Sequence, residues 1–251
     1  MRPFEDLTAA EALAADVTGW GFGWLDGRAT EERPPWGYAR LLADRLARVD
    51  SALDVDTGGG EVVAEAPVLP PRMVVTEGLP PNARRARELL GPRGVTVVEP
   101  GDGVEPADAS FDLVSSRHPV RPDWAEIRRV LRPGGTHLGQ HVGPRSAFEL
   151  IERFLGPVPG PVARDPDDEA ADAERAGLTV VDLRRATCRM ELHDVGAVVW
   201  LLRKCVWWVP DFSVDRYEDT LRALDAEMRA GRPVVAHSTR HLIEARRGPA
   251  A

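Results

Sequence analysis

The spacing of apolar residues divides the chain into a helical N-terminal part and a longer part in which short strands alternate with helices. Residues 5–17 and 38–49 carry apolar side chains at the intervals of a helix face. Between them, residues 19–38 contain scattered glycines and paired prolines, so we expect a loop there. The pattern predicts an N-terminal helical cap over residues 1–50.

From residue 51 the apolar runs shorten to strand length, and helical stretches separate several of them. Strands are predicted at 52–55, 72–76, 95–98, 111–115 and 136–142. The intervening helices are predicted at 82–90 and 123–131. Alternation of this kind is typical of βαβ units around a parallel sheet with right-handed crossovers.

The C-terminal part adds helices and three strand candidates, two of which would bring the five-stranded sheet to seven strands. The predicted helices are 146–155, 195–206 and 214–230, and the strand candidates are 178–185, 233–237 and 241–245. Residues 156–170 are rich in glycine, proline and aspartate and predict an exposed loop, and the acid-rich run 165–174 predicts the end of this loop and the start of a helix. We therefore expect an α/β fold with a doubly wound, mostly parallel sheet of seven strands and helices on both faces. Residues 51–251 should form one domain, in which 188–232 is an insert that covers the substrate.

Charge and composition narrow the classes of partner. The chain has 251 residues and a net charge of −8, which disfavours nucleic acid because phosphate binders usually carry a basic surface. No apolar run approaches the roughly 20 residues that span a bilayer. The acidic start lacks the apolar core of a signal peptide. Cys188 and Cys205 form no disulfide framework, so we expect a reducing, cytoplasmic location and no membrane association.

A glycine-rich turn follows the first predicted strand of the sheet. The segment ALDVDTGGGE contains Asp54 at the strand end and the turn Asp56-Thr57-Gly58-Gly59-Gly60. An acid, Glu77, ends the next strand 17 residues after Gly60, where it can accept hydrogen bonds from ribose hydroxyls. The Walker pattern of phosphate-binding loops and the GxGxxG form are both absent from this turn. The pair predicts a nucleotide-containing cofactor other than a nucleoside triphosphate or a dinucleotide.

Four segments resemble the successive motifs of class I S-adenosylmethionine-dependent methyltransferases. They are ALDVDTGGGE, VVTEGLPPNARRARELL, SFDLVSSRHPV and EIRRVLRPGGTHL, and together they cover about residues 50–140. The resemblance implies a seven-stranded sheet whose last strand is antiparallel. It also implies S-adenosyl-L-methionine as the cofactor and methyl transfer as the activity.

The resemblance assigns cofactor contacts residue by residue. Asp54, Gly58 and Gly60 match the acid and the later glycines of the first motif, and Glu77 matches the acid that binds the ribose. Asp56 stands where the first glycine is usual, and aspartate adopts the left-handed backbone less freely. We expect its side chain to cap a backbone amide or to meet the cofactor ammonium. The expected cofactor set is Asp54, Asp56, Thr57, Gly58, Gly60, Glu77, Gly78, Leu79, Asp102 (near the adenine amine) and Ser115.

Methyl transfer from a sulfonium depends mainly on positioning, and a base is needed only if the acceptor keeps its proton until attack. His118 and His141 are candidate bases, because each lies at the carboxyl end of a predicted parallel strand, where ligands of open sheets bind. The alternative for each is a hydrogen-bonded structural histidine, which is our interpretation of His137. No metal is assigned, since no ligand spacing is evident among the remaining histidines His193, His237 and His241.

Aromatic residues gather in two segments, 18–38 and 195–217, which hold six of the seven tryptophans. We expect these segments to close over the methyl group as a lid suited to an apolar or aromatic small molecule. Core packing is the alternative for each residue. The expected substrate contacts are Trp24, Trp36, Tyr38, Trp200 and Trp207, and Trp20 belongs to the same segment as the first three.

The sequence therefore favours a methyltransferase of small molecules that acts on oxygen or nitrogen. Two other functions stay open. One is methylation of RNA or protein, of which RNA is disfavoured by the negative net charge of the chain. The other is a cofactor-binding homologue without methyl transfer, for which Asp56 is the motivating residue. The oligomeric state and the acceptor atom are not specified by the sequence.

Overall fold

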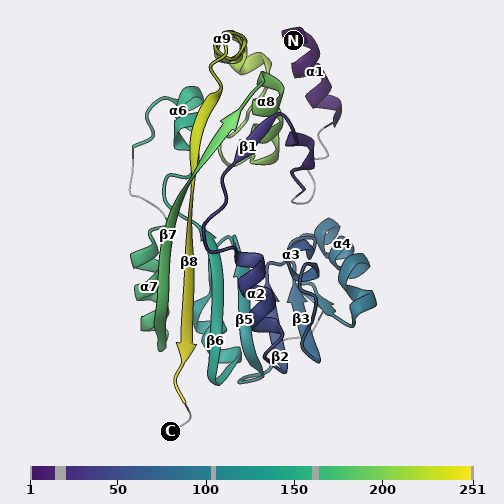
Figure 1. Ribbon diagram of the computed structural model, residues 1–251, viewed down its shortest axis with the longest axis vertical. Coiled ribbons are helices and arrows are strands. Elements are labelled where there is room, and N and C mark those ends of the chain that lie inside the picture. The colour runs from purple at the N-terminus through teal and green to yellow at the C-terminus, as the bar shows by residue number, and fades with distance from the viewer. Residues whose placement is uncertain (1, 15–20, 103–105, 160–163, 250–251) are drawn as a thin grey trace. The chain divides into compact units, whose positions relative to one another are not determined.

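The computed structural model describes residues 2–14, 21–102, 106–159 and 164–249, and Figure 1 shows how its elements follow one another. The helices are α1 (Phe4–Ala14), α2 (Tyr38–Leu46), α3 (Glu61–Ala64), α4 (Pro80–Leu90), α5 (Trp124–Val130), α6 (Phe148–Leu155), α7 (Pro166–Arg175), α8 (Val195–Lys204) and α9 (Glu218–Arg229). The strands are β1 (Ala29–Glu31), β2 (Ser51–Val55), β3 (Arg72–Thr76), β4 (Thr96–Val98), β5 (Phe111–Arg117), β6 (Leu131–Val142), β7 (Leu178–Leu192) and β8 (Val234–Arg247).

The strands form one sheet in the order β1-β7-β8-β6-β5-β2-β3-β4. The five strands from β2 to β6 pair in parallel, and β8 pairs with β6 antiparallel. The predicted doubly wound, mostly parallel fold with an antiparallel last strand is thus confirmed. The sheet has eight strands where seven were expected, because the short β1 pairs with β7 inside the segment predicted as a loop.

Two other predictions about local structure were wrong. Residues 233–237 and 241–245 belong to a single strand, β8, because antiparallel pairing with β6 continues through the residues between them. The predicted loop extends too far, because residues 166–170 already belong to α7; the helix start expected in the run 165–174 falls at its second residue. Asp165 caps this helix by accepting a hydrogen bond from the amide of Asp167 at 2.8 Å, and the proline and acids that follow favour a first helical turn.

The chain divides into two compact units. Unit 1 comprises residues 1–33, 145–162 and 187–239, and unit 2 comprises 34–144, 163–186 and 240–251. Residues 34–50, expected in the cap, therefore belong to unit 2, and the expected insert 188–232 belongs to unit 1.

Unit 2 is a sheet with helices on both faces, because neighbouring strand residues point to opposite sides. Ala52 packs on one face with side chains of α2, α3 and α4. Leu53 packs on the other face with side chains of α5 and α7. This arrangement leaves the carboxyl ends of the parallel strands to form the candidate site.

Unit 1 has a hydrophobic core of its own. Its largest contribution comes from α8, which is buried along nearly its whole length and packs with residues of α1, α6 and α9. Among the residues that the structure describes, no helix combines the length and the apolar character needed to cross a membrane.

Candidate functional site

The glycine-rich turn lies at the carboxyl end of β2 and adopts left-handed backbone at several residues. The φ angles of Asp56, Gly58 and Gly60 are 55°, 65° and 81°. A side chain at Gly60 would place its Cβ 2.6 Å from Leu90 Cδ1, so a glycine is needed there for α4 to pack against the turn. The run of glycines leaves the backbone of this turn open to close approach by a ligand.

Glu77 fastens this turn to the end of β3. Its Oε2 accepts a hydrogen bond from the amide of Gly58 at 2.8 Å, and its Oε1 accepts one from the amide of Leu79 at 2.7 Å. The residue is only 6% exposed. Gly78 and Leu79, also in the expected cofactor set, link Glu77 to α4, and Leu79 is exposed. Each carboxylate oxygen retains a lone pair, so Glu77 can accept a further hydrogen bond on either side.

Asp54 is a buried acid at the end of β2, paired with the neighbouring strand. It accepts a hydrogen bond from Ser115 Oγ of β5 at 2.5 Å. Burial raises the pKa of Asp54 to about 6, although the Ser115 hydrogen bond opposes this shift. Asp54 is therefore an acid whose charge changes in the physiological range.

Asp56 and Asp102 have different surroundings. Burial raises the pKa of Asp56, and its side chain accepts a hydrogen bond from the backbone of Val120. This is amide capping, one of the two alternatives expected for the residue. Asp102 is 44% exposed on its side chain and accepts a hydrogen bond from the amide of Glu99 at 2.9 Å.

His118 follows β5 in left-handed conformation, with φ at 57°. Trp36 Nε1 donates to Gln140 Oε1 at 2.7 Å, which orients the amide so that Gln140 Nε2 faces His118 Nε2 at 3.3 Å. Burial, followed by the charges of neighbouring arginines, holds the pKa of His118 well below its usual range. His118 is therefore neutral at physiological pH and can accept a proton.

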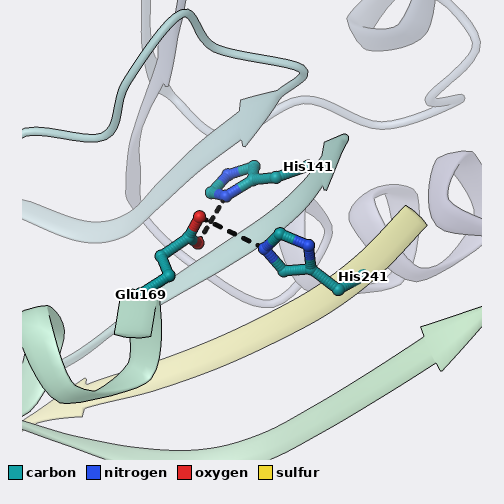
Figure 2. Close-up of side chains that lie close together, drawn as sticks. All are labelled: His141, Glu169 and His241. Carbon is teal, nitrogen blue, oxygen red and sulfur yellow. Dashed lines mark hydrogen bonds and ion pairs between the residues drawn. The ribbon is translucent and has the colours of Figure 1, made fainter. Parts of the chain in front are cut away.

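His141 is the second candidate base, and it lies in a cluster with Glu169 and His241 (Figure 2). His141 Nδ1 is 2.6 Å from Glu169 Oε1, and His241 Nε2 is 3.2 Å from Glu169 Oε2. The side chains of His141, Glu169 and His241 are 4%, 12% and 0% exposed. Burial lowers the pKa of His141 despite the Glu169 carboxylate beside it. Burial alone would raise the pKa of Glu169, but the hydrogen bond with His141 and the nearby His241 ring lower it to about 2.

A hydroxyl joins this cluster to a third buried histidine. Ser116 Oγ is 2.9 Å from His141 Nε2 and 3.1 Å from His137 Nε2. The space for both rings exists because Gly139 lies between them, where a Cβ would be 2.5 Å from His141 Nε2 and 2.7 Å from His137 Cε1. Burial lowers the pKa of His137 to about 3, so this ring is neutral.

The expected substrate residues lie in both units. Trp36 and Tyr38 are buried in unit 2, where the Tyr38 hydroxyl is 3.0 Å from the Ser116 carbonyl oxygen. In unit 1, Trp24 stacks on Trp200 with ring centroids 5.7 Å apart. Trp207 is 54% exposed. Trp20 lies outside the described residues.

Sequence reasoning missed Glu169, and it gave His241 no role. Glu169 stands in an acidic run interpreted as exposed loop and helix start, and its partners lie 28 positions earlier and 72 positions later in the chain. The available signal was Asp165-Pro166, an N-cap followed by proline, which marks a helix start and turns the acids that follow into helical positions.

The chain resembles known proteins in sequence and in fold. No known family model matches it. It is 36% identical over 146 residues to a protein-L-isoaspartate O-methyltransferase of Methanoculleus marisnigri, a match that covers 51% of this chain and 65% of the relative. The matched part thus spans somewhat less than two thirds of the curated relative.

Solved structures show the same fold at low identity. A proposed methyltransferase of Bacillus halodurans C-125 is 19% identical, with a TM-score of 0.58 over 83% of this chain and 98% of that one. A phosphoethanolamine N-methyltransferase of Haemonchus contortus, solved with S-adenosylhomocysteine, is 15% identical, with a TM-score of 0.52 over 100% of this chain and 61% of that one. The sheet, the glycine-rich turn and these likenesses define a class I methyltransferase fold. The sequence motifs resemble those of class I methyltransferases, and both the sequence relative and the shared fold agree with that resemblance.

Proposed function

We propose that this chain is an S-adenosylmethionine-dependent methyltransferase that methylates an oxygen or nitrogen of a small molecule. The observation that carries the proposal is the pairing of a glycine-rich turn with a buried acid at adjacent parallel strand ends. Glu77 holds the amide of Gly58 at 2.8 Å, so the turn and the acid form one rigid element. The sequence likeness to a methyltransferase supports the same reading.

The residues of this edge fit the cofactor. Glu77 has lone pairs left for the ribose hydroxyls, and the turn from Gly58 to Gly60 has no side chains that would block an approaching ligand. Asp54 and Asp56 supply carboxylates for the ammonium of the methionine part. When bound, S-adenosylmethionine supplies a methyl group already activated by the sulfonium.

His118 is the base that we propose for an acceptor that arrives protonated. His141 is less suited, because one of its ring nitrogens faces Ser116 and the other faces Glu169. His118 is not fully buried and contacts Gln140 only at 3.3 Å. Proton uptake at His118 Nε2 would break this long contact. Because the pKa of His118 is lowered, the rate should stay level through the ordinary histidine range and fall only at lower pH.

Calorimetric titration with S-adenosylmethionine and S-adenosylhomocysteine tests cofactor binding. A screen with methyl-labelled cofactor then tests transfer to small hydroxyl and amine acceptors. His118→Ala should lose most of the rate on such acceptors, whereas His193→Ala, a histidine of unit 1, should retain it. Absence of cofactor binding would refute the proposal. Binding without any transfer would favour the cofactor-binding homologue instead.

Methylation of isoaspartate in proteins is the second candidate, and the name of the sequence relative favours it. A carboxylate acceptor is already deprotonated at neutral pH and needs no base. Transfer to an isoaspartyl peptide that survives His118→Ala would therefore favour this candidate. Transfer to a phenol or amine that is lost in the same variant favours the small-molecule acceptor.

A further inference from the structure

The histidine pair in unit 2 is built by strand register. His141 on β6 and His241 on β8 are direct cross-strand partners in the antiparallel ladder. Directly opposed residues point to the same face of a sheet with their Cβ atoms about 5 Å apart. Their rings accordingly meet edge to face, with centroids 5.4 Å apart. Two imidazoles are thereby held at a fixed separation on a buried face of the sheet.

Helix α7 brings a carboxylate to these two rings. Figure 2 shows Glu169 reaching from the helix toward both histidines, with one oxygen directed to each. The ligand atoms of all three side chains lie within 4.8 Å of one another. Three protein donors, two imidazole nitrogens and one carboxylate oxygen, thus converge from β6, α7 and β8.

The hydrogen bonds of this cluster are incomplete. Neither ring nitrogen of His241 has a hydrogen-bond partner among the described residues, although the side chain is fully buried. His241 Nε2 lies 3.2 Å from Glu169 Oε2, close enough for an ion pair but without hydrogen-bond geometry. Buried polar groups are normally paired, and buried carboxylates are normally matched by a cation. The cluster therefore lacks a partner that a positive ion could supply.

Hydrogen bonds behind the cluster orient the His141 ring. Ser116 Oγ lies 2.9 Å from His141 Nε2, the nitrogen that points away from Glu169. Histidines that ligate a metal through one nitrogen usually have the other held by a hydrogen bond of this kind. His137 fixes Ser116 in turn, at 3.1 Å. His141 is thus presented with Nδ1 toward Glu169 as a ligand would be.

From this arrangement we infer that His141, Glu169 and His241 bind a divalent transition-metal ion, with Zn²⁺ the ion best matched. The inference does not rest on the methyltransferase activity. Two imidazoles with one carboxylate form a ligand set typical of zinc, whereas magnesium and calcium prefer oxygen ligands alone. On binding, the proton between His141 and Glu169 leaves to solvent and the ion takes its place. The ion would connect β6, α7 and β8 at one point.

Metal-free full-length protein titrated with Zn²⁺ tests the inference. We expect one ion per chain and, at free Zn²⁺ about 100-fold above Kd, an increase of about 100-fold in the ratio of folded to unfolded protein. X-ray absorption of the loaded protein should show two imidazole ligands with oxygen donors. Mg²⁺ titrated under the same conditions should give no comparable stabilisation.

Variants distinguish Zn²⁺ binding at this cluster from Zn²⁺ binding at surface histidines. Glu169→Gln keeps the side-chain volume, and His241→Ala removes a ligand, so each should weaken Zn²⁺ binding by at least about 100-fold. The matched control is His237→Ala, because His237 forms an exposed pair with Glu149 at 2.8 Å and should not affect stoichiometric binding. Circular dichroism checks that each variant is folded.

Three outcomes would overturn the inference: no stoichiometric Zn²⁺ binding by the wild-type protein, binding that His237→Ala removes but Glu169→Gln does not, or an absorption spectrum without imidazole ligands. The first and third use only the wild-type protein, so the test stands even if a variant fails to fold. Failure of S-adenosylmethionine to bind would refute the proposed function and leave this result unaffected.

Discussion

Two acids of unit 2, Glu77 and Glu169, are held in opposite ways. Glu77 binds backbone amides of residues at most 19 positions away, Gly58 and Leu79. Glu169 binds side chains of His141 and His241, which come from two different strands. The first arrangement is local and backbone-directed, so a short motif reveals it. The second exists only after three distant elements have packed, and it depends on side-chain identity throughout.

The largest expected effect concerns Asp54, a buried acid that belongs to neither of these two arrangements, and it is an effect on the pH dependence of the free energy of unfolding. The folded pKa is about 6 against an ordinary 3.8, so the folded state binds the proton more tightly than the unfolded state. The contribution of Asp54 to the free energy of unfolding should therefore be about 3 kcal/mol smaller at about pH 7 than at about pH 4. Asp54→Asn should lack this contribution, so between the two pH values the wild-type protein should lose about 3 kcal/mol relative to the variant, which urea unfolding of both proteins measures.

Asp112 is a control of opposite sign for the Asp54 experiment. Hydrogen bonds with Ser51 and Arg132 outweigh burial and lower the pKa of Asp112. Its stabilising contribution is therefore lost as pH falls, and Asp112→Asn should remove a change in that direction. Equal pH slopes in wild-type protein and Asp54→Asn would show that Asp54 is not perturbed.

The second largest effect is expected on cofactor affinity when the hydrogen bonds of Glu77 to the backbone amides are removed. Glu77→Ala removes the acid that holds the turn and, in the proposed function, the ribose. S-adenosylmethionine affinity should weaken by about 1.5–3 kcal/mol, as for lost hydrogen bonds to a charged acceptor. The comparison is Asp102→Ala, which should weaken affinity less because that side chain is 44% exposed. Calorimetry that gives the same Kd for Glu77→Ala and wild-type protein would reject the assignment.

A crowding substitution tests the side-chain arrangement. In Gly139→Ala the new methyl group would meet the His141 and His137 rings at 2.5 and 2.7 Å, so unfolding free energy should fall by about 1–3 kcal/mol. Gly78→Ala is the matched change near Glu77, where the nearest atom to the new methyl lies 3.9 Å away. It should change stability by no more than about 0.5 kcal/mol. Thermal unfolding that ranks the two variants the other way would contradict the packing described.

The smallest effect is expected at Asp56. Asp56→Gly relieves a left-handed backbone, worth about 1 kcal/mol, but removes the hydrogen bond to the Val120 backbone, worth about as much. The net change in unfolding free energy should stay within about 1 kcal/mol. Cofactor affinity measured on the same variant distinguishes the roles of Asp56, since a loss of affinity would mark it as a ligand. Asp56→Asn, which keeps a capping oxygen, serves as the reference.

The difference between the two acids also explains what the sequence could predict. The run Arg72–Thr76 was predicted with the bounds of β3, because a short apolar strand between turn residues is a local pattern. The glycine-rich turn was recognisable for the same reason. Register is not local: nothing in the sequence states that His141 faces His241, and a shift by one residue would turn one of them to the other face. The position of Glu169 depends in addition on α7, whose acid-rich first turns resemble an exposed loop in composition.

The order of strands has a consequence for how the protein is made. β8, residues Val234–Arg247, lies between β6 and β7, both of which precede it in the chain. Until β8 has been synthesised, β6 and β7 each have one edge without its native partner strand. Unpaired strand edges can pair with strands of other chains. The nascent protein therefore passes through a stage that is prone to aggregation, and the last of the described strands ends that stage by filling the gap. A chain truncated before residue 234 would keep two such unpaired edges, one on β6 and one on β7.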